Sequence, residues 1–392
     1  MLAKRMGLIK PSSTMAISAK TNEMIAKGIS VIDFGLGQPE FKTPDVASEA
    51  GIQAIRDGYT KYTPTAGADD LKLAIIEKLQ NDHQLTYNKK EVIVSCGAKH
   101  SLYNIAQVLF EEGDEVIIPA PYWVTYPDQV RLNGATPVIV KTREQDRFLM
   151  TKDQLKDAMT PRTKAIILNS PSNPTGSVYT EKDFSEIADL LISAGLWIIS
   201  DEIYEKFIYD GKKYTSIASL SPDLKNKTIL VNGVSKSYSM TGWRIGYSAG
   251  PQEVIEAMST LQSQTTSNPS SISQKAAVAA LKQGGPFILN MVSEYSTRRA
   301  LMVKQLNKID GMFCPHPAGA FYVFPNVSGL LGKRSAINSS AAFAEYLLED
   351  YKVSTVPGEP FGMDGYLRLS YAAPQQALIE GLDRIRKAVL NL

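Results

Sequence analysis

A lysine follows the end of a short apolar segment, next to side chains that suit a phosphate group. Residues 228–231 are β-branched or aliphatic, which predicts a buried strand that ends in a turn. Lys236 comes just after that turn, where open α/β sheets collect their ligands. Ser235 and Arg244 supply a hydroxyl and a guanidinium, both of which bind phosphate well. A lysine beside a phosphate-binding pair indicates a cofactor that is both an aldehyde and a phosphate ester, namely pyridoxal 5'-phosphate (PLP).

Polar and aromatic side chains also follow other strand-like segments. Asp201 closes one of them, and a carboxylate there would pair with a protonated pyridine nitrogen and keep the ring an electron sink. Trp123 follows another and offers a flat face for the ring. The turn 97–99 precedes helical spacing over 101–110, and its small residues would let backbone N–H groups face a phosphate. Alone, such residues could equally be a helix cap, a core or rim tryptophan and a plain turn, so the site is predicted from their combination.

The segment from Gly233 to Gly246 resembles the lysine signature of the class I PLP-dependent aminotransferases, enzymes of fold type I. Three further motifs stand in that family's order: N-P-T-G at 173–176, D-E-x-Y at 201–204 and R-L-S-Y at 368–371. The resemblance covers nearly the whole chain, and the chain looks like the bacterial aspartate aminotransferases of the aspartate/prephenate branch. It implies an aminotransferase that acts on an amino acid and a 2-oxo acid, as a homodimer with shared active sites.

The resemblance also implies a role for each matching residue. Lys236 would bind the PLP aldehyde and move the substrate's α-proton, and Asp201 would pair with the pyridine nitrogen. Tyr204 is the third predicted catalytic residue. Tyr204 and Asn173 would hydrogen-bond the phenolic oxygen, and Arg368 would grip the substrate's α-carboxylate. The remaining cofactor-binding residues are Gly97, Ala98, Lys99, Trp123, Ser235, Arg244 and the partner subunit's Tyr62. The other substrate-binding residues are Gly37, Trp123, Asn173, Lys99 and Lys10.

The substrate is predicted from the cations that would face its side chain. Dicarboxylate-specific members of one branch use an arginine after the lysine, from the partner subunit, but this chain has no arginine between Arg244 and Arg298. In the branch that the chain resembles, lysines take over, and Lys99 and Lys10 are the candidates. We therefore predict amino transfer from L-aspartate to 2-oxoglutarate. The alternatives are a prephenate or aromatic amino acid aminotransferase, or a PLP carbon–sulfur lyase of the same fold.

The elements that must position these residues indicate an α/β fold. Apolar segments alternate with amphipathic helical stretches between residues 91 and 231, which predicts a mostly parallel sheet covered on both faces. The resemblance gives this sheet seven strands, in a large PLP-binding domain over 46–295. Residues 1–45 with 296–392 are predicted to form a smaller α/β domain. A length of 392 residues agrees with more than one domain.

Composition argues against other classes of function. A net charge of +2 gives no electrostatic reason to bind nucleic acid or a membrane, and no apolar run reaches the roughly 20 residues of a membrane helix. The two cysteines lie far apart and the three histidines are scattered, so we predict neither a disulfide framework nor a metal site. The G-x-G at 35–37 lacks a third glycine and meets Pro39, which disfavours a dinucleotide-binding turn. We expect a cytoplasmic enzyme.

Overall fold

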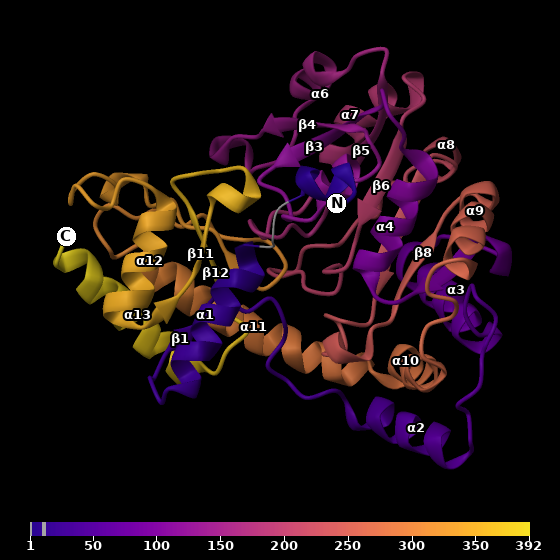
Figure 1. The fold of residues 1–392 in the computed structure, drawn as a ribbon, viewed down its shortest axis with the longest axis horizontal. Helices are drawn as coiled ribbons and strands as arrows, with labels where there is room; N and C mark the ends of the chain where they lie inside the picture. The colour runs from indigo at the N-terminus through magenta and orange to yellow at the C-terminus, as the bar shows by residue number, and fades with distance from the viewer. Residues whose placement is uncertain (1, 10–12) are drawn as a thin grey trace.

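The structure, a computed structural model, describes residues 2–9 and 13–392. Figure 1 shows two lobes, a larger one built round a central sheet and a smaller one that holds the C-terminus together with α1 (Ser13–Ala26) and β1 (Ile32–Asp33). The long helix α11 (Gly285–Leu306) runs from the larger lobe into the smaller one. Both ends of the chain thus contribute to the small lobe, while the domain boundaries themselves stay a prediction.

The large lobe contains a seven-stranded sheet that is parallel except for one strand. Its order is β2 (Val92–Ser95), β8 (Gly246–Ala249), β7 (Thr228–Gly233), β6 (Trp197–Asp201), β5 (Thr163–Asn169), β3 (Glu115–Ala120) and β4 (Thr136–Lys141). Strand β8 is antiparallel to both of its neighbours. The prediction of a mostly parallel seven-stranded sheet is confirmed. Sequence patterns do not reveal β8, because it is short and directly follows the glycine- and serine-rich lysine segment.

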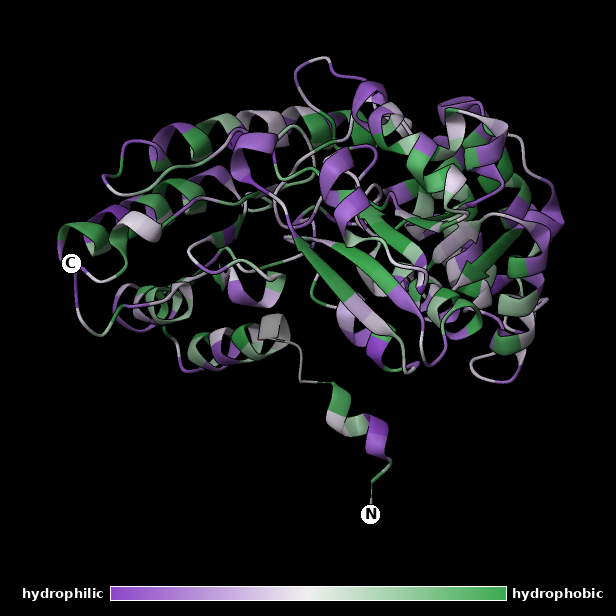
Figure 2. Ribbon diagram, turned by 90° about the horizontal axis from the view of Figure 1, so that it is seen from above, coloured by the Kyte–Doolittle hydropathy of each residue, from purple (hydrophilic) through white to green (hydrophobic). Residues whose placement is uncertain are grey.

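Side chains of the parallel strands alternate between apolar cores on the two faces of the sheet. Val116 and Ile118 pack in one core and Ile117 in the other. The first face packs against α4 (Ala98–Leu109), α5 (Tyr126–Arg131) and α9 (Gln252–Ser263), and the second against α6 (Lys152–Ala158), α7 (Glu181–Ser193) and α8 (Pro222–Lys225). Figure 2 shows the strands as a largely green, apolar layer among helices that alternate green and purple. Because helices cover both faces of the sheet, we expect ligands to bind at the loops that follow the carboxyl ends of the strands.

Three further helices cover the β2–β8 end of the sheet. These are α2 (Asp45–Arg56), α3 (Asp69–His83) and α10 (Ser271–Gln283), which share a core with Val92, Val94 and Leu230. The short 3-10 helices are η1 (Lys4–Leu8), η2 (Lys89–Glu91), η3 (Glu144–Asp146), η4 (Ile217–Ser219), η5 (Thr241–Trp243), η6 (Ser328–Leu330) and η7 (Glu359–Phe361). Across residues 2–9 and 13–392, no helix combines the length and hydropathy needed to cross a membrane.

The small lobe holds two short sheets against α11. β1 pairs in parallel with β10 (Val353–Ser354), while β11 (Val356–Pro357), β12 (Leu367–Ser370) and β9 (Tyr322–Val323) form an antiparallel sheet in that order. Helices α12 (Ser340–Tyr351) and α13 (Gln375–Leu390) complete its core. The chain pairs with β1 before Thr355 and with β12 after it. Strands β10 and β11 are therefore only two residues long each. This lobe places β12 and β9 beside the carboxyl ends of the central strands, where the polar residues of the large lobe lie.

Candidate active site

A cavity of about 420 Å³ lies where the carboxyl ends of the central strands meet the small lobe. The ends of β5 and β6 contribute Asn169 and Asp201, and the small lobe contributes Tyr322 and Arg368. Most residues predicted from the sequence line this cavity: Gly37, Ala98, Lys99, Trp123, Asn173, Asp201, Tyr204, Ser235, Lys236, Arg244 and Arg368. The structure therefore brings together residues that lie more than 300 positions apart in the chain, such as Gly37 and Arg368.

Lys236 follows β7 closely and presents its amine to the cavity. Its Nζ donates a hydrogen bond to the Gly37 carbonyl at 2.5 Å. Burial, helped by the positive charges of Arg368 and Arg244, lowers the pKa of the amine to about 8. The Asp201 carboxylate opposes this shift. A lysine with such a pKa supplies an unprotonated amine near neutral pH, which both a nucleophile and a general base require.

Asp201 closes β6 and is 4% exposed. One carboxylate oxygen accepts a hydrogen bond from the Tyr126 hydroxyl at 2.6 Å, and the other accepts from the Ile203 N–H at 3.2 Å. Burial raises the pKa of Asp201 to about 6, although both hydrogen bonds favour the ionised form. A carboxylate that is costly to ionise gains from a cation placed against it, and a protonated pyridine nitrogen is such a cation.

Two tyrosines of the site escape prediction from the sequence. Tyr126, at the start of α5, reaches Asp201 from the turn that begins at Trp123. Tyr322, in β9, shares a hydrogen bond of 2.9 Å with the Tyr204 hydroxyl. Both hydroxyls are buried, and a buried phenol usually finds a partner. The sequence pattern indicates that these rings are buried, but it does not indicate which polar group each of them meets.

Arg368 lies in β12 and is almost fully buried. Its Nη1 donates to Asn173 Oδ1 at 3.1 Å and its Nη2 to the Gly35 carbonyl at 2.6 Å. The guanidinium lies 4.6 Å from the centroid of the Tyr322 ring. Its Nε is buried without a hydrogen-bond partner in the described part of the chain. A buried guanidinium with unused donor capacity at a cavity suits a carboxylate ligand.

The turn between β2 and α4 meets the Arg244 side chain at one end of the cavity. Gly97 has a φ of +90°, and a Cβ there would lie 2.2 Å from Arg244 Nη2, so the position requires glycine. Helix α4 begins at Ala98, earlier than the helical spacing indicates, which puts Ala98 and Lys99 in its first turn. Their backbone N–H groups, the Ser235 hydroxyl and the Arg244 guanidinium together suit a phosphate group.

Four predicted residues need separate mention. Lys99 extends over the ring of Trp123, with its Nζ 4.8 Å from the ring centroid, at the wall of the cavity. Tyr62 does not line the cavity of its own chain, and its side chain is 90% exposed. Gly97 lies next to the cavity-lining Ala98 rather than in the lining itself. Lys10 lies outside the described residues.

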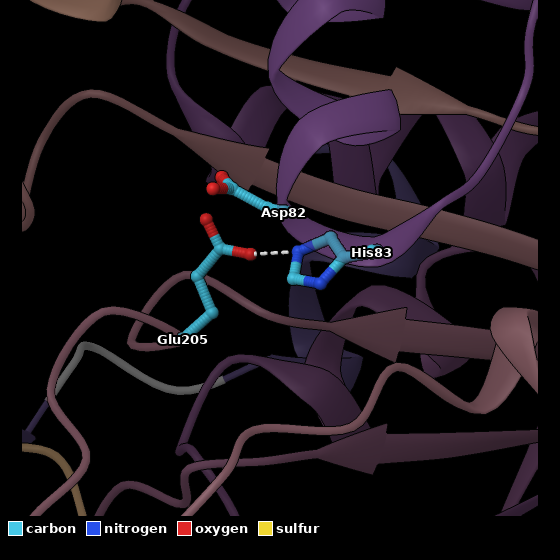
Figure 3. A group of neighbouring side chains, drawn as sticks. All are labelled: Asp82, His83 and Glu205. Atoms are coloured by element: carbon cyan, nitrogen blue, oxygen red, sulfur yellow. Dashed lines mark hydrogen bonds and ion pairs between the residues drawn. The ribbon is translucent and has the colours of Figure 1, made fainter.

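A second cluster, Asp82, His83 and Glu205, has the residue types of a metal site but is already neutralised by lysines. Figure 3 shows Glu205 reaching the ring of His83, with Asp82 close by. Lys78 contacts both carboxylates, and Lys206 Nζ lies 2.7 Å from Asp82. Because ammonium groups already balance these acids, we interpret the cluster as a structural network that supports the turn after β6.

The lowered pKa of Lys236 predicts how the reaction of its amine with an aldehyde depends on pH. We expect the rate at which cofactor-free protein takes up PLP, followed by absorbance, to rise with pH through a midpoint near 8 and then level off. The reason is that only the unprotonated amine attacks an aldehyde. Arg368→Met removes a positive charge that lowers this pKa, so its midpoint should lie higher. A rate that rises steadily to about pH 10, the range of an ordinary lysine, would contradict this expectation.

Known proteins are similar to this chain over nearly its whole length. Residues 29–385 match the family model for aminotransferase class I and II. The aspartate aminotransferase of Geobacillus stearothermophilus is 49% identical over 98% of each chain. The probable aspartate/prephenate aminotransferase of Aquifex aeolicus is 46% identical over 99% of this chain and 98% of its own. The crystal structure of the aspartate aminotransferase from Rhizobium meliloti has a TM-score of 0.95 at 43% identity, covering 99% of this chain and 98% of that one.

Proposed function

The chain belongs to the aminotransferase class I and II family, and from this premise we propose that it binds PLP and transfers the amino group of L-aspartate to 2-oxoglutarate. The products are oxaloacetate and L-glutamate. The observation that carries the proposal is the placement of Lys236, Asp201 and Arg368 round one cavity, which offers an amine of lowered pKa, a carboxylate and a carboxylate-binding guanidinium together.

The residues round the cavity fit PLP in kind and in position. Lys236 would hold its aldehyde carbon and Asp201 its pyridine nitrogen. The phosphate would meet the anion-binding set formed by Ser235, Arg244 and the start of α4, where the glycine-only position leaves room beside the guanidinium. The other contacts are proposed for Asn173 and Tyr204 at the phenolic oxygen and for Trp123 against the ring. When bound, PLP supplies an electron sink that makes the α-proton of an amino acid removable.

The chain's own residues then bind the substrate and move a proton. Arg368 binds the α-carboxylate and so fixes the direction of the remaining bonds at the α-carbon. Lys236, whose amine is largely neutral above about pH 8, accepts the α-proton and later returns it. Asp201 holds a negative charge at the floor of the site, and the Tyr126 hydrogen bond fixes its orientation. Residues of both lobes line the cavity in which the reaction would take place.

We propose a homodimer in which each subunit contributes to the other's site. The loop that carries Tyr62 is held by two buried glutamines, although Tyr62 itself protrudes. Gln262 Nε2 donates to the Thr65 carbonyl at 2.8 Å, and Gln274 Nε2 donates to Thr63 Oγ1 at 3.0 Å. A firmly held loop that presents an exposed tyrosine suits contact with a second copy of the chain. Sedimentation of the PLP-loaded protein tests this, and a monomer at micromolar concentration would contradict it.

Lys99 is proposed to bind the side-chain carboxylate of aspartate. Its ammonium lies at the cavity wall beside Trp123, within the same cavity as Arg368, so the two cations can take the two carboxylates of one substrate. Lys10 is proposed as a second cation for the same group. Prephenate, which also carries two carboxylates, is the second candidate substrate, and it is favoured by the name of the Aquifex relative.

Replacing Lys99 tests this assignment. In Lys99→Ala we expect kcat/KM for aspartate to fall about tenfold or more, because a charge-assisted hydrogen bond to the side-chain carboxylate is lost. The value for phenylalanine, which lacks that carboxylate, should stay within a factor of about two. Lys89→Ala, which removes a lysine paired with Asp69 at the surface, is the control and should change neither value. An equal loss for aspartate and phenylalanine would remove Lys99 as a determinant of specificity.

The proposed reaction is tested by a panel of amino donors with 2-oxoglutarate and with prephenate as acceptors. We expect aspartate to be the best donor with 2-oxoglutarate. A preference for prephenate would favour the second candidate. Release of pyruvate and ammonia from cysteine conjugates, without amino transfer, would identify a lyase and refute the proposal.

We also propose that the enzyme works in the cytoplasm on small-molecule substrates. Cys96 and Cys314 are both free thiols, which suits a reducing compartment. Localisation of a fluorescently tagged enzyme in the source cell tests this proposal.

A further inference from the structure

Residues 35–43 connect β1 in the small lobe to α2 in the large lobe, and we call them the strap. The cavity-lining residues of the strap are Gly35, Leu36, Gly37 and Gln38. Two of its backbone carbonyls accept hydrogen bonds from residues with proposed roles. The carbonyl of Gly35 accepts from Arg368 Nη2 at 2.6 Å, and that of Gly37 accepts from Lys236 Nζ at 2.5 Å. The position of the strap therefore affects the groups that would hold the substrate and the cofactor.

The second half of the strap is tied to the segment that follows the lysine. Ser239 Oγ donates to the Phe41 carbonyl, and Thr43 Oγ1 donates to the Ser239 carbonyl at 3.0 Å. Trp243 Nε1 donates to Thr43 Oγ1, also at 3.0 Å. These hydrogen bonds fix the strap to the large lobe, but they do not fix it to the small lobe.

Among the described residues, Glu40 provides the side-chain hydrogen bonds that join the strap to α11, and the neighbouring Phe41 ring packs edge-on against Phe287 and Tyr295 of the same helix. Glu40 accepts hydrogen bonds from Arg298 Nη1 and, at 2.9 Å, from the Tyr295 hydroxyl. The side chains of Glu40 and Arg298 are 22% and 9% exposed. The guanidinium of Arg298 also lies 5.6 Å from the centroid of the Phe41 ring. Arg298 has a second carboxylate partner, Glu294, whose Oε2 lies 3.4 Å from Arg298 Nη2. The side chain of Glu294 is 51% exposed. Because Arg298 is buried, removing its closer partner would leave a poorly compensated charge under the strap.

We propose that Glu40 is a positioning residue, which holds the strap on α11 and thereby keeps Arg368 oriented toward the cavity. The inference rests on the proposed function of Arg368 as the group that binds the α-carboxylate. Every amino acid and 2-oxo acid carries that carboxylate, so a looser strap weakens the binding of all substrates by the same factor. This distinguishes Glu40 from Lys99, whose loss affects only substrates with a second carboxylate.

The test compares Glu40→Gln with the wild type, both loaded with PLP. We expect the KM values for aspartate, phenylalanine and 2-oxoglutarate to rise together by about tenfold, while kcat changes by less than about threefold. At saturating PLP the absorbance of the bound cofactor should persist, because no side chain proposed to contact PLP is replaced. A purely structural role would lower the melting temperature and the yield without this common shift in KM. Glu40→Asp keeps the charge and should recover part of the loss.

Glu294→Gln is the matched control, because it removes the other carboxylate from the same arginine without touching the strap. It should leave every KM unchanged. Unchanged KM values in Glu40→Gln, a loss confined to one donor, or an equal loss in Glu294→Gln would overturn the inference. If Glu40→Gln does not fold, Tyr295→Phe, which removes one hydrogen bond to Glu40, must still raise all three KM values, and unchanged values would overturn the inference. Absence of amino transfer in the wild type itself would refute the proposed function instead.

Discussion

Lys236→Ala loses transamination, with a fall in kcat of about 10⁴-fold, the upper end of what a positioned acid–base group contributes. Arg368 and Arg244, the two cations that lower the pKa of this amine most, cannot replace it, because a guanidinium does not give up its proton near neutral pH. The variant also lacks the amine proposed to attach to the PLP aldehyde, so the absorbance of that linkage should disappear. Steady-state kinetics with aspartate and 2-oxoglutarate, together with the absorption spectrum, measure both effects.

An exposed lysine provides the control for this variant. Lys308→Ala changes a lysine just after α11, outside the cavity, and should keep full activity and the full spectrum. Melting temperatures of both variants show whether either change disturbs the fold. If Lys236→Ala retained more than about a hundredth of the wild-type kcat, Lys236 could not be the group that moves the α-proton.

Asp201→Asn is expected to have the second largest effect, a fall in kcat of about 10²–10³-fold. Asparagine keeps the shape of the side chain and can still pair with the Tyr126 hydroxyl, but it carries no negative charge. Without that charge at the buried end of the site, the pyridine nitrogen loses its proton more easily and the ring becomes a weaker electron sink. KM should change much less than kcat, because the proposed contacts with the substrate's carboxylates are made by Arg368 and Lys99 and not by Asp201.

The same variant has a spectroscopic readout. The pH dependence of the bound cofactor's absorbance should shift, because the charge that favours the protonated pyridine is gone. Asp223→Asn, an exposed residue in the first turn of α8, is the control and should leave both kcat and the spectrum unchanged. A kcat within a factor of about three of the wild type would contradict the proposed role of Asp201.

The parts of the site that follow strand ends could be predicted from the sequence. Apolar runs mark β5, β6 and β7, and the polar residues after them are Asn173, Asp201 and Lys236, which the parallel sheet must bring to one edge. The central sheet and the enzyme class follow from the same motifs, and both predictions are confirmed. Roles within the site stay proposals, because they depend on a cofactor and a substrate.

Contacts between distant parts of the chain could not be predicted. The ion pair of Glu40 with Arg298 joins residues 258 positions apart, and neither residue stands in a motif that indicates the other. The hydrogen bond of Tyr204 with Tyr322 depends on how the two lobes pack, which hydrophobic periodicity does not specify. The start of α4 at Ala98 also escapes the pattern, because Lys99 and His100 interrupt the spacing of apolar residues in its first turn.

The central claim is that the amine of Lys236 closes onto the aldehyde of PLP. The most direct test is to incubate the protein with PLP, reduce it with borohydride, digest it and locate the modified residue by mass spectrometry. The account predicts one major modified peptide, in which Lys236 carries the reduced pyridoxyl phosphate group. Protein that stays colourless and gains no mass on this peptide, or that carries the group on another lysine, would contradict it.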